Sequence, residues 1–299
     1  MSKKVLAIYY SQSGQLQEII DNFCQPLVEK GISVERVNIE LQNPHMLPWT
    51  ADNFFGVMPD CVLGIPAEIK PFVLREPTYD LIVLGYQAWF LSPSIPFNSF
   101  IHHPSVQHVL KDTPVITITG ARNMWVNAFK GVKKILKESG ARLAGNISLV
   151  DRHLNLVSFV TIFHWMLHNK KDRYLNIFPK PGVSDTDIAN TKVFGEIVIP
   201  HIEKGEWNGL QAELMGSKAV DLKYHLMFIE SKAGIMFTVW AKFIATKQNK
   251  TAWLVAFKYY LMIALFVATP IVFVFDQLFF KPFLPRYIRR QKEALLNFS

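Results

Sequence analysis

Short apolar runs alternate with segments of helical periodicity along residues 1–205. An apolar run with almost no charge is typical of a strand that is buried on both faces of a parallel sheet. Apolar residues three to four positions apart are typical of the helices that cover such a sheet. The five predicted strands cover 4–10, 32–39, 80–86, 113–119 and 143–149. The alternation therefore predicts an α/β fold with a doubly wound, five-stranded parallel sheet.

Two of the predicted helices have well-marked ends. One covers 124–139 and the other covers 184–204, and a glycine follows each of them. Glycine is favoured just beyond a helix because it adopts a left-handed backbone conformation without strain. We expect the second helix to be the last element of an α/β domain that covers 1–205.

An apolar insertion separates the fifth predicted strand from that last helix. It covers 151–183 and contains LNLVSFVTIFHWML at 154–167. A segment so rich in apolar and aromatic residues needs a partner surface. Open α/β sheets bind ligands at the carboxyl ends of their strands, and the insertion leaves from that edge. We therefore expect it to form a roof over a binding site.

The remaining residues, 206–299, are predicted to be a helical, membrane-associating region. Residues 259–275 contain no charge and approach the length that crosses a bilayer, and 233–246 form a shorter apolar helix. We expect association with a membrane surface, or a span, through 233–246 and 253–280. A hairpin, an anchor lying in the membrane surface and an ordinary packed helix of an appended domain remain open.

Charge separates the two parts of the chain and bears on its partners. Residues 1–205 carry 20 basic and 18 acidic side chains, whereas 206–299 carry 12 and 6, so most of the net charge of +8 borders the apolar segments. Basic residues beside apolar helices favour anionic lipid headgroups on the cytoplasmic face of a membrane. We expect no nucleic-acid partner, because the basic residues do not form an aromatic-studded surface.

The two cysteines, Cys24 and Cys61, have no paired spacing and no nearby histidine. We therefore expect neither a disulfide framework nor a metal site, and a reducing, cytoplasmic setting.

The first predicted strand runs directly into a turn of serine and glycine and then a helix, in VLAIYYSQSGQL at 5–16. A loop at the start of a helix presents unpaired backbone N–H groups and the positive end of the helix dipole, so it binds a phosphate without basic side chains. The spacing matches neither the GxGxxG dinucleotide loop nor the nucleotide P-loop. The predicted phosphate-binding residues are Ser11, Gln12, Ser13, Gly14, Gln15 and Leu16.

Two further loops follow the third and fourth predicted strands. Because the carboxyl ends of parallel strands meet at one edge of a sheet, we expect these loops to close the same crevice. The candidate residues are Gln87, Ala88, Trp89 and Phe90 in one loop, and Gly120, Ala121, Arg122 and Asn123 in the other.

Two of these segments resemble those of flavodoxin-like proteins. Residues 5–16 are similar to the family's phosphate loop, aromatic-x-Ser/Thr-x-x-Gly-x-Thr, with Leu16 at the final threonine. YDLIVLGYQAWFLSPSIPFNSFI at 79–101 resembles the Gly-Tyr-Pro-x-Trp-x-Gly segment of flavodoxin-like quinone reductases, with Gln87 at the proline and Leu91 at the last glycine. The resemblance implies a flavodoxin-like fold that binds FMN, with the phosphate in the first loop and the flavin ring beside the second.

A narrower resemblance covers most of the chain. IYYSQSGQL, GYQAWFLSPSIPFNSF, the apolar insertion and the hydrophobic tail together look like the bacterial proteins labelled dialkylresorcinol-condensing enzymes, which accompany aryl-polyene and flexirubin pigment clusters. This implies work beside a ketosynthase and an acyl carrier protein, with conversion of a cyclised dialkyl diketone to a dialkylresorcinol. Because no condensing site is visible, we interpret the chain as an FMN-dependent oxidoreductase that aromatises this lipophilic substrate.

Aromatisation requires hydride loss to the flavin and a base that removes a neighbouring proton. The predicted base is His164 in the insertion. Tyr86, at the end of a predicted strand, is a candidate hydrogen-bond donor to substrate, although a core aromatic residue is the favoured interpretation. An NAD(P)H:quinone reductase is the alternative enzyme. A non-enzymatic electron carrier, or a scaffold that has lost FMN, is the alternative outside enzymes.

Overall fold

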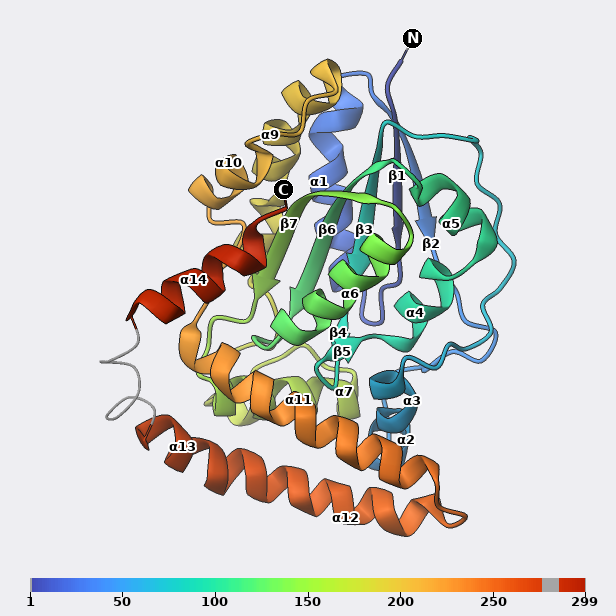
Figure 1. The fold of residues 1–299 in the computed structure, drawn as a ribbon. Coiled ribbons are helices and arrows are strands. Elements are labelled where there is room, and N and C mark those ends of the chain that lie inside the picture. Colours follow the sequence, from blue (N-terminus) through green and yellow to red (C-terminus); the bar gives the residue numbers. More distant parts are fainter. Residues whose placement is uncertain (1, 276–284, 299) are drawn as a thin grey trace.

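The computed structural model describes residues 2–275 and 285–298. Five parallel strands form one sheet in the order β2-β1-β3-β6-β7 (Figure 1). Counted along the chain this order is 2-1-3-4-5, the order of the flavodoxin-like doubly wound fold. The predicted fold class is therefore confirmed. The strands are β1 (Lys4–Tyr9), β2 (Ser33–Asn38), β3 (Leu81–Tyr86), β6 (Pro114–Ala121) and β7 (Arg142–Val150).

Helices cover both faces of the sheet, which is why its central strands contain almost no polar residues. Every residue of β3 is buried, whereas in the edge strand β2 one residue, Glu35, is buried and the others are half-buried or exposed. One face packs against α1 (Gln15–Glu29), α8 (Asp185–Ala189) and α9 (Thr191–Lys204). The other packs against α4 (Ile95–Ile101), α5 (Pro104–Leu110) and α6 (Val126–Glu138).

The insertion crosses the carboxyl ends of the strands as α7 (Asn155–His168), followed by the short turn η1 (Tyr174–Asn176) (Figure 1). The buried carboxylate of Asp151, at the end of β7, ties its two ends together. Its Oδ2 accepts hydrogen bonds from the Ser158 hydroxyl at 2.9 Å and from the Gly182 amide at 3.3 Å. Both the departing and the returning chain are thus fixed at one point above the sheet.

The core around the sheet continues beyond the domain boundary predicted at residue 205. Helix α10 (Leu210–Gly216) packs Leu210 and Leu214 into it, and both side chains are fully buried. Val220 then bridges to Ser148 of β7. The division of the chain at 205 stays a prediction, with α10 packed on the α/β side.

Two long helices form an antiparallel hairpin across the carboxyl end of the sheet (Figure 1). The inner arm is α11 (Tyr224–Ala245). The outer arm is continuous from α12 (Lys250–Ile263) through the π-helix η2 (Ala264–Ala268) to α13 (Thr269–Phe275). In the described residues, one helix, Lys250–Ile271, is long and apolar enough to cross a membrane by length and composition. Residues 276–280 of the predicted 253–280 segment lie outside the described residues.

A second core, the hairpin core, joins the hairpin to two short helices, α2 (Ala51–Gly56) and α3 (Met58–Leu63). Its buried members are Phe55, Met58, Phe237, Ala241, Ile244 and Phe257.

After the hairpin, α14 (Pro285–Leu296) returns to the α/β domain beside α6 (Figure 1). The Lys133 ammonium donates to the Leu295 carbonyl at 3.1 Å, and the rings of Phe129 and Phe298 lie 6.2 Å apart. Both flanks of the hairpin are therefore attached to the same domain.

Candidate functional site

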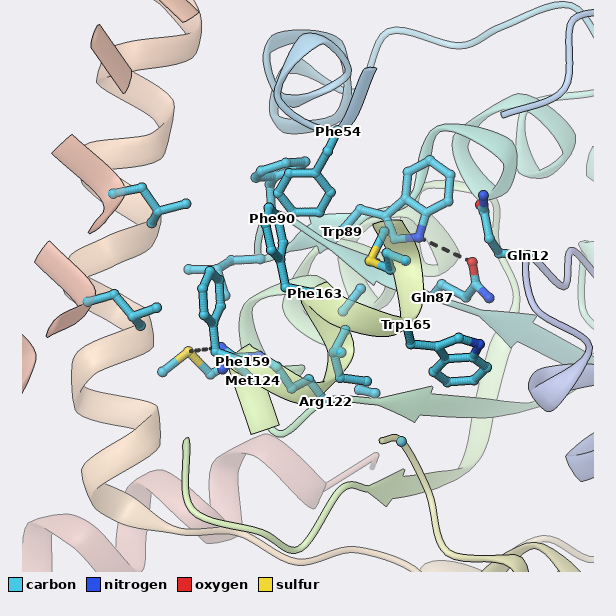
Figure 2. Close-up of a pocket in the computed structure, with 18 of the residues that line it drawn as sticks. Gln12, Phe54, Gln87, Trp89, Phe90, Arg122, Met124, Phe159, Phe163 and Trp165 are labelled. Atoms are coloured by element: carbon cyan, nitrogen blue, oxygen red, sulfur yellow. Dashed lines mark hydrogen bonds between the residues drawn. The ribbon is translucent and has the colours of Figure 1, made fainter. Parts of the chain in front are cut away.

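A cavity of about 300 Å³ lies at the carboxyl ends of the strands, beneath α7 and the hairpin (Figure 2). All three predicted loops line it, as expected for the ligand crevice of an open α/β sheet. Of the predicted cofactor residues, the cavity brings together Gln12, Ser13, Gln15, Leu16, Gln87, Ala88, Trp89, Phe90, Gly120, Ala121 and Arg122. Ser11, Gly14 and Asn123 belong to the same loops but are not part of the lining.

The first loop has the geometry of an anion cradle. Gly14 has φ +85°, a left-handed conformation that glycine adopts without strain, and a Cβ added there would meet open space. The Ser11 hydroxyl accepts a hydrogen bond from the Gln17 amide at 3.2 Å, which fixes the loop against α1. Across the residues that the structure describes, no partner accepts a hydrogen bond from the backbone N–H groups of residues 12–16. These donors at the start of α1 remain available to a phosphate.

The second loop is a tight two-stranded turn, β4 (Ala88–Trp89) paired with β5 (Ser92–Pro93). Phe90 and Leu91, at its tip, have φ of 47° and 62°. Left-handed backbone costs a non-glycine residue about 1–2 kcal/mol, so this turn is held by its surroundings. The buried Cys61 thiol donates to the Trp89 carbonyl at 3.1 Å. Leu91 stands at the last glycine of the Gly-Tyr-Pro-x-Trp-x-Gly segment, and it adopts the left-handed conformation that favours glycine.

The third loop brings a positive charge into the cavity. Arg122 Nη1 donates to both the carbonyl and the side-chain oxygen of Asn155, at 2.9 and 2.8 Å. The guanidinium also lies 5.7 Å from the centre of the Phe159 ring. Burial lowers the pKa of Arg122 to about 10, so the group stays charged at neutral pH.

The roof of the cavity is apolar and largely aromatic, and it comes from segments far apart in the sequence. Phe54 lies 5.0 Å from Phe90 and 5.4 Å from Phe163, ring centre to ring centre (Figure 2). The lining from α7 is Phe159, Ile162, Phe163, Trp165 and Met166; the lining from the hairpin is Ile229, Ala233, Phe237, Tyr260, Leu261, Ala264, Leu265 and Thr269. The roof predicted from the insertion is therefore shared with the hairpin.

Neither predicted catalytic residue lines the cavity. His164 places Nε2 3.2 Å from Asp172 Oδ1 and stacks on His168, while its neighbours Phe163 and Trp165 face the cavity. Tyr86 is buried in the sheet core beside Phe97, and burial raises its pKa well above the ordinary value. Among the described lining residues there is no His, Asp or Glu. The catalytic roles of His164 and Tyr86 stay predictions, and the positions of the two side chains outside the cavity do not favour them.

Comparisons with known proteins give fold neighbours only. No protein-family profile and no curated protein matches the chain. A flavoprotein from Lactobacillus acidophilus NCFM, crystallised in complex with FMN, is similar at 17% identity and TM-score 0.40, over 49% of this chain and 93% of that one. Oxidised flavodoxin 1 from Bacillus cereus is similar at 14% and 0.36, over 67% and 99%. The flavodiiron protein from Giardia intestinalis is similar at 10% and 0.35, over 68% and 38%.

At these identities and TM-scores the sheet order of this chain, and not its neighbours, establishes the fold. The chain is a flavodoxin-like α/β protein with a helical roof over the ligand crevice.

Proposed function

We propose that the protein binds FMN and acts as a flavin-dependent oxidoreductase on a lipophilic substrate. The observation that carries this proposal is the single cavity that joins the cradle at the start of α1 to an aromatic chamber beneath the hairpin. In this proposal the N–H groups of residues 12–16 hold the phosphate. Trp89 and Phe90 border the flavin ring, and the apolar roof packs against the lipophilic substrate. The flavin supplies hydride transfer, and the chain supplies binding and orientation.

The proposed reaction is oxidative aromatisation of a cyclised dialkyl diketone to a dialkylresorcinol, beside a ketosynthase and an acyl carrier protein. The resemblance of the sequence and the apolar lining support it. The substrate ring loses one hydrogen as hydride to the flavin and a second as a proton. Because no acidic or imidazole side chain is among the described lining residues, the proton leaves to water. An aromatic chamber also suits a quinone, so quinone reduction is the competing function.

Flavin binding is tested by titrating FMN into the full-length protein and following the quenching of its fluorescence. We expect one FMN per chain. Gly14→Val is expected to weaken binding at least tenfold, because a β-branched residue is strained at φ +85°. Gly205→Val is the matched control, since Gly205 has φ +73°, an equally open surrounding and no place in the site. Equal loss in both variants, or no uptake of FMN, would contradict the proposal.

The reaction is tested anaerobically with the FMN-loaded protein and a 2,5-dialkylcyclohexane-1,3-dione. We expect one resorcinol for each flavin bleached. Bleaching by NADPH with turnover of a quinone, and no resorcinol, would establish the quinone reductase instead. If the protein binds FMN but catalyses neither reaction, the electron-carrier alternative is favoured. If it binds no FMN, the scaffold alternative is favoured.

We also propose that the hairpin lies in the surface of a membrane, at its cytoplasmic face, without crossing it. Its outer arm exposes a row of large apolar side chains, including Ile263, Val267 and Ile271, which are 62%, 55% and 52% exposed. Lys242 and Lys250 lie on the hairpin and suit anionic headgroups. Because α11 and α14 both pack on the α/β domain, a hairpin held on one side of the bilayer fits better than a span.

Membrane binding is tested by sedimentation with anionic phospholipid vesicles. We expect the wild-type protein to sediment with them, and less so with neutral vesicles or at high salt. Replacing Ile263, Val267 and Ile271 by Glu together is expected to leave most of the protein in solution. The control is Val73→Glu on the α/β domain, where the side chain is 85% exposed. Equal sedimentation of the triple variant and the control would favour the packed-helix alternative.

A further inference from the structure

Arg122 carries the one charged side chain among the described residues that line the cavity. Its partners are all neutral: the Asn155 oxygens, the Phe159 ring and the Met124 sulfur, which lies 3.7 Å from Nη2. Within the described residues no carboxylate lies within 4.0 Å of its guanidinium, and its Nε–H donates no hydrogen bond.

The two carboxylates whose charges act on Arg122, Asp151 and Glu230, accept hydrogen bonds from other groups, and the Glu230 Oε2 has no hydrogen-bond partner among the described residues. Asp151 accepts hydrogen bonds from Ser158, Gly182 and the His153 amide. Glu230, on α11, accepts from the Asn127 amide at 2.7 Å at the start of α6. Both raise the pKa of Arg122 through their charge, but neither forms an ion pair with it. A half-buried charge whose hydrogen-bond partners are all neutral is only partly compensated, so the guanidinium is placed to bind an anion from outside the chain.

Arg122 lies away from the phosphate loop. Figure 2 shows Arg122 with Met124 and Phe159 toward one side of the cavity, and Gln12 with Gln87 toward the other. The cradle at the start of α1 needs no basic side chain. The charge of Arg122 is therefore placed for a second negative group, at the aromatic end where α7 lines the chamber.

We propose that Arg122 binds an anionic oxygen of the lipophilic substrate, which is therefore an acidic amphiphile: an ionised enol of a β-dicarbonyl compound, or a carboxylate. This inference rests on the proposed function and names its substrate class. A cyclic 1,3-diketone is a vinylogous acid and ionises readily, so it meets this requirement, whereas a neutral quinone does not. In this arrangement the apolar part of the substrate packs against Phe159, Phe163 and Leu265.

Two matched pairs of probes test the inference by calorimetry, with and without FMN. The first pair is 5-pentylcyclohexane-1,3-dione and its neutral methyl enol ether, and the second is dodecanoate and dodecan-1-ol. We expect the wild-type protein to bind the anionic member of at least one pair at least tenfold more tightly. The pair that shows this preference identifies the enolate or the carboxylate as the ligand. Equal binding within both pairs would overturn the inference.

Arg122→Gln is expected to lose this preference by weakening only the anionic probe, and Arg122→Lys to retain part of it. Arg152→Gln is the control. This substitution removes the same charge, but from a side chain on the exposed surface of the insertion. If Arg122→Gln weakens the binding of both members of a pair equally, the role of Arg122 is structural: it holds α7 in place through Asn155. If the substrate-free Arg122→Gln variant shows a shifted flavin midpoint potential and an unchanged preference for the anionic probe, Arg122 interacts with the flavin and not with the substrate. Either result would overturn the inference, while FMN affinity reports separately on the proposed function.

Discussion

The sheet core and the hairpin core consist of different side chains and are shielded from solvent to different degrees. The sheet core consists mostly of Val, Ile and Leu, which come from the strands and from the helices that cover both faces of the sheet. The hairpin core is rich in aromatic rings, such as Phe237 and Phe257, whose centres lie 5.5 Å apart. It is covered on its inner side by the α/β domain, while its outer arm leaves Ile263 and Val267 exposed.

This difference indicates two kinds of stability in one chain. A layer closed on both sides contributes to global unfolding, whereas a layer closed on one side opens locally at lower cost. A contiguous exposed apolar surface also calls for a further partner, which isolated exposed residues such as Val73 do not.

The largest effect is expected from Phe97→Ala in the sheet core. Phe97 is fully buried between Tyr86 and Phe100. Removing a buried phenyl ring costs about 4 kcal/mol, and here we expect the loss to appear as global unfolding. Denaturant titration followed by circular dichroism measures it. Phe97→Leu, which preserves most of the volume, is expected to cost about 1 kcal/mol. A loss confined to the hairpin would contradict the division into two cores.

Phe257→Ala in the hairpin core is expected to act locally. Phe257 packs against Phe55, Phe237 and Trp240. We expect the amides of α11 and α12 to lose about 3 kcal/mol of protection, while those of β3 and β6 keep theirs. Native-state hydrogen exchange read by mass spectrometry measures both regions in one experiment. Uniform loss across the chain would show that the two cores unfold as one.

The smallest effect concerns pH and the junction between the two regions. Glu230 of α11 is buried against the start of α6, and burial raises its pKa from 4.5 to about 7. Folding therefore favours its protonated form, so stability is full below pH 4.5 and falls as pH rises toward 7. Between pH 6 and 8 we expect a loss of about 1 kcal/mol. Thermal unfolding of Glu230→Gln, which is neutral at every pH, is expected to lack this change. An unchanged pH dependence in this variant would assign the effect to other groups.

The strands β1, β3 and β6 and the loops after them were predictable because each leaves a local pattern: a run with almost no charge, then a turn with Gly or Ser. The hairpin's part in the cavity was not predictable from such a pattern. Its helices are apolar on most sides, so no stripe marks the face that lines the site. Contacts such as Phe54 with Phe163 join residues more than a hundred positions apart, and only tertiary packing brings them together.

The two predicted catalytic residues show the limits of local reasoning within single elements. Successive residues of a helix point about 100° apart, so the position of Trp165 in the roof does not bring its neighbour His164 into the cavity. In the strand, Tyr86 faces the helices that cover the sheet, and it packs on Phe97 instead of the crevice. Arg122 was predicted to bind the cofactor and lines the cavity, but the absence of an ionic partner became visible only through the positions of Asp151 and Glu230.

The π-helix in the outer arm affects which side chains of that arm face the cavity. The wider turn over Ala264–Ala268 accommodates one residue more than an α-helix would, and the Thr269 hydroxyl donates to the Ala264 carbonyl at 2.8 Å. Ala264, Leu265 and Thr269 all reach the cavity from this turn. Regular α-helical winding of the same residues would rotate α13 by about 100° relative to its present position, whereas the wider turn absorbs the extra residue. The phase of the helix, and not only its hydrophobicity, therefore determines which side chains close the chamber.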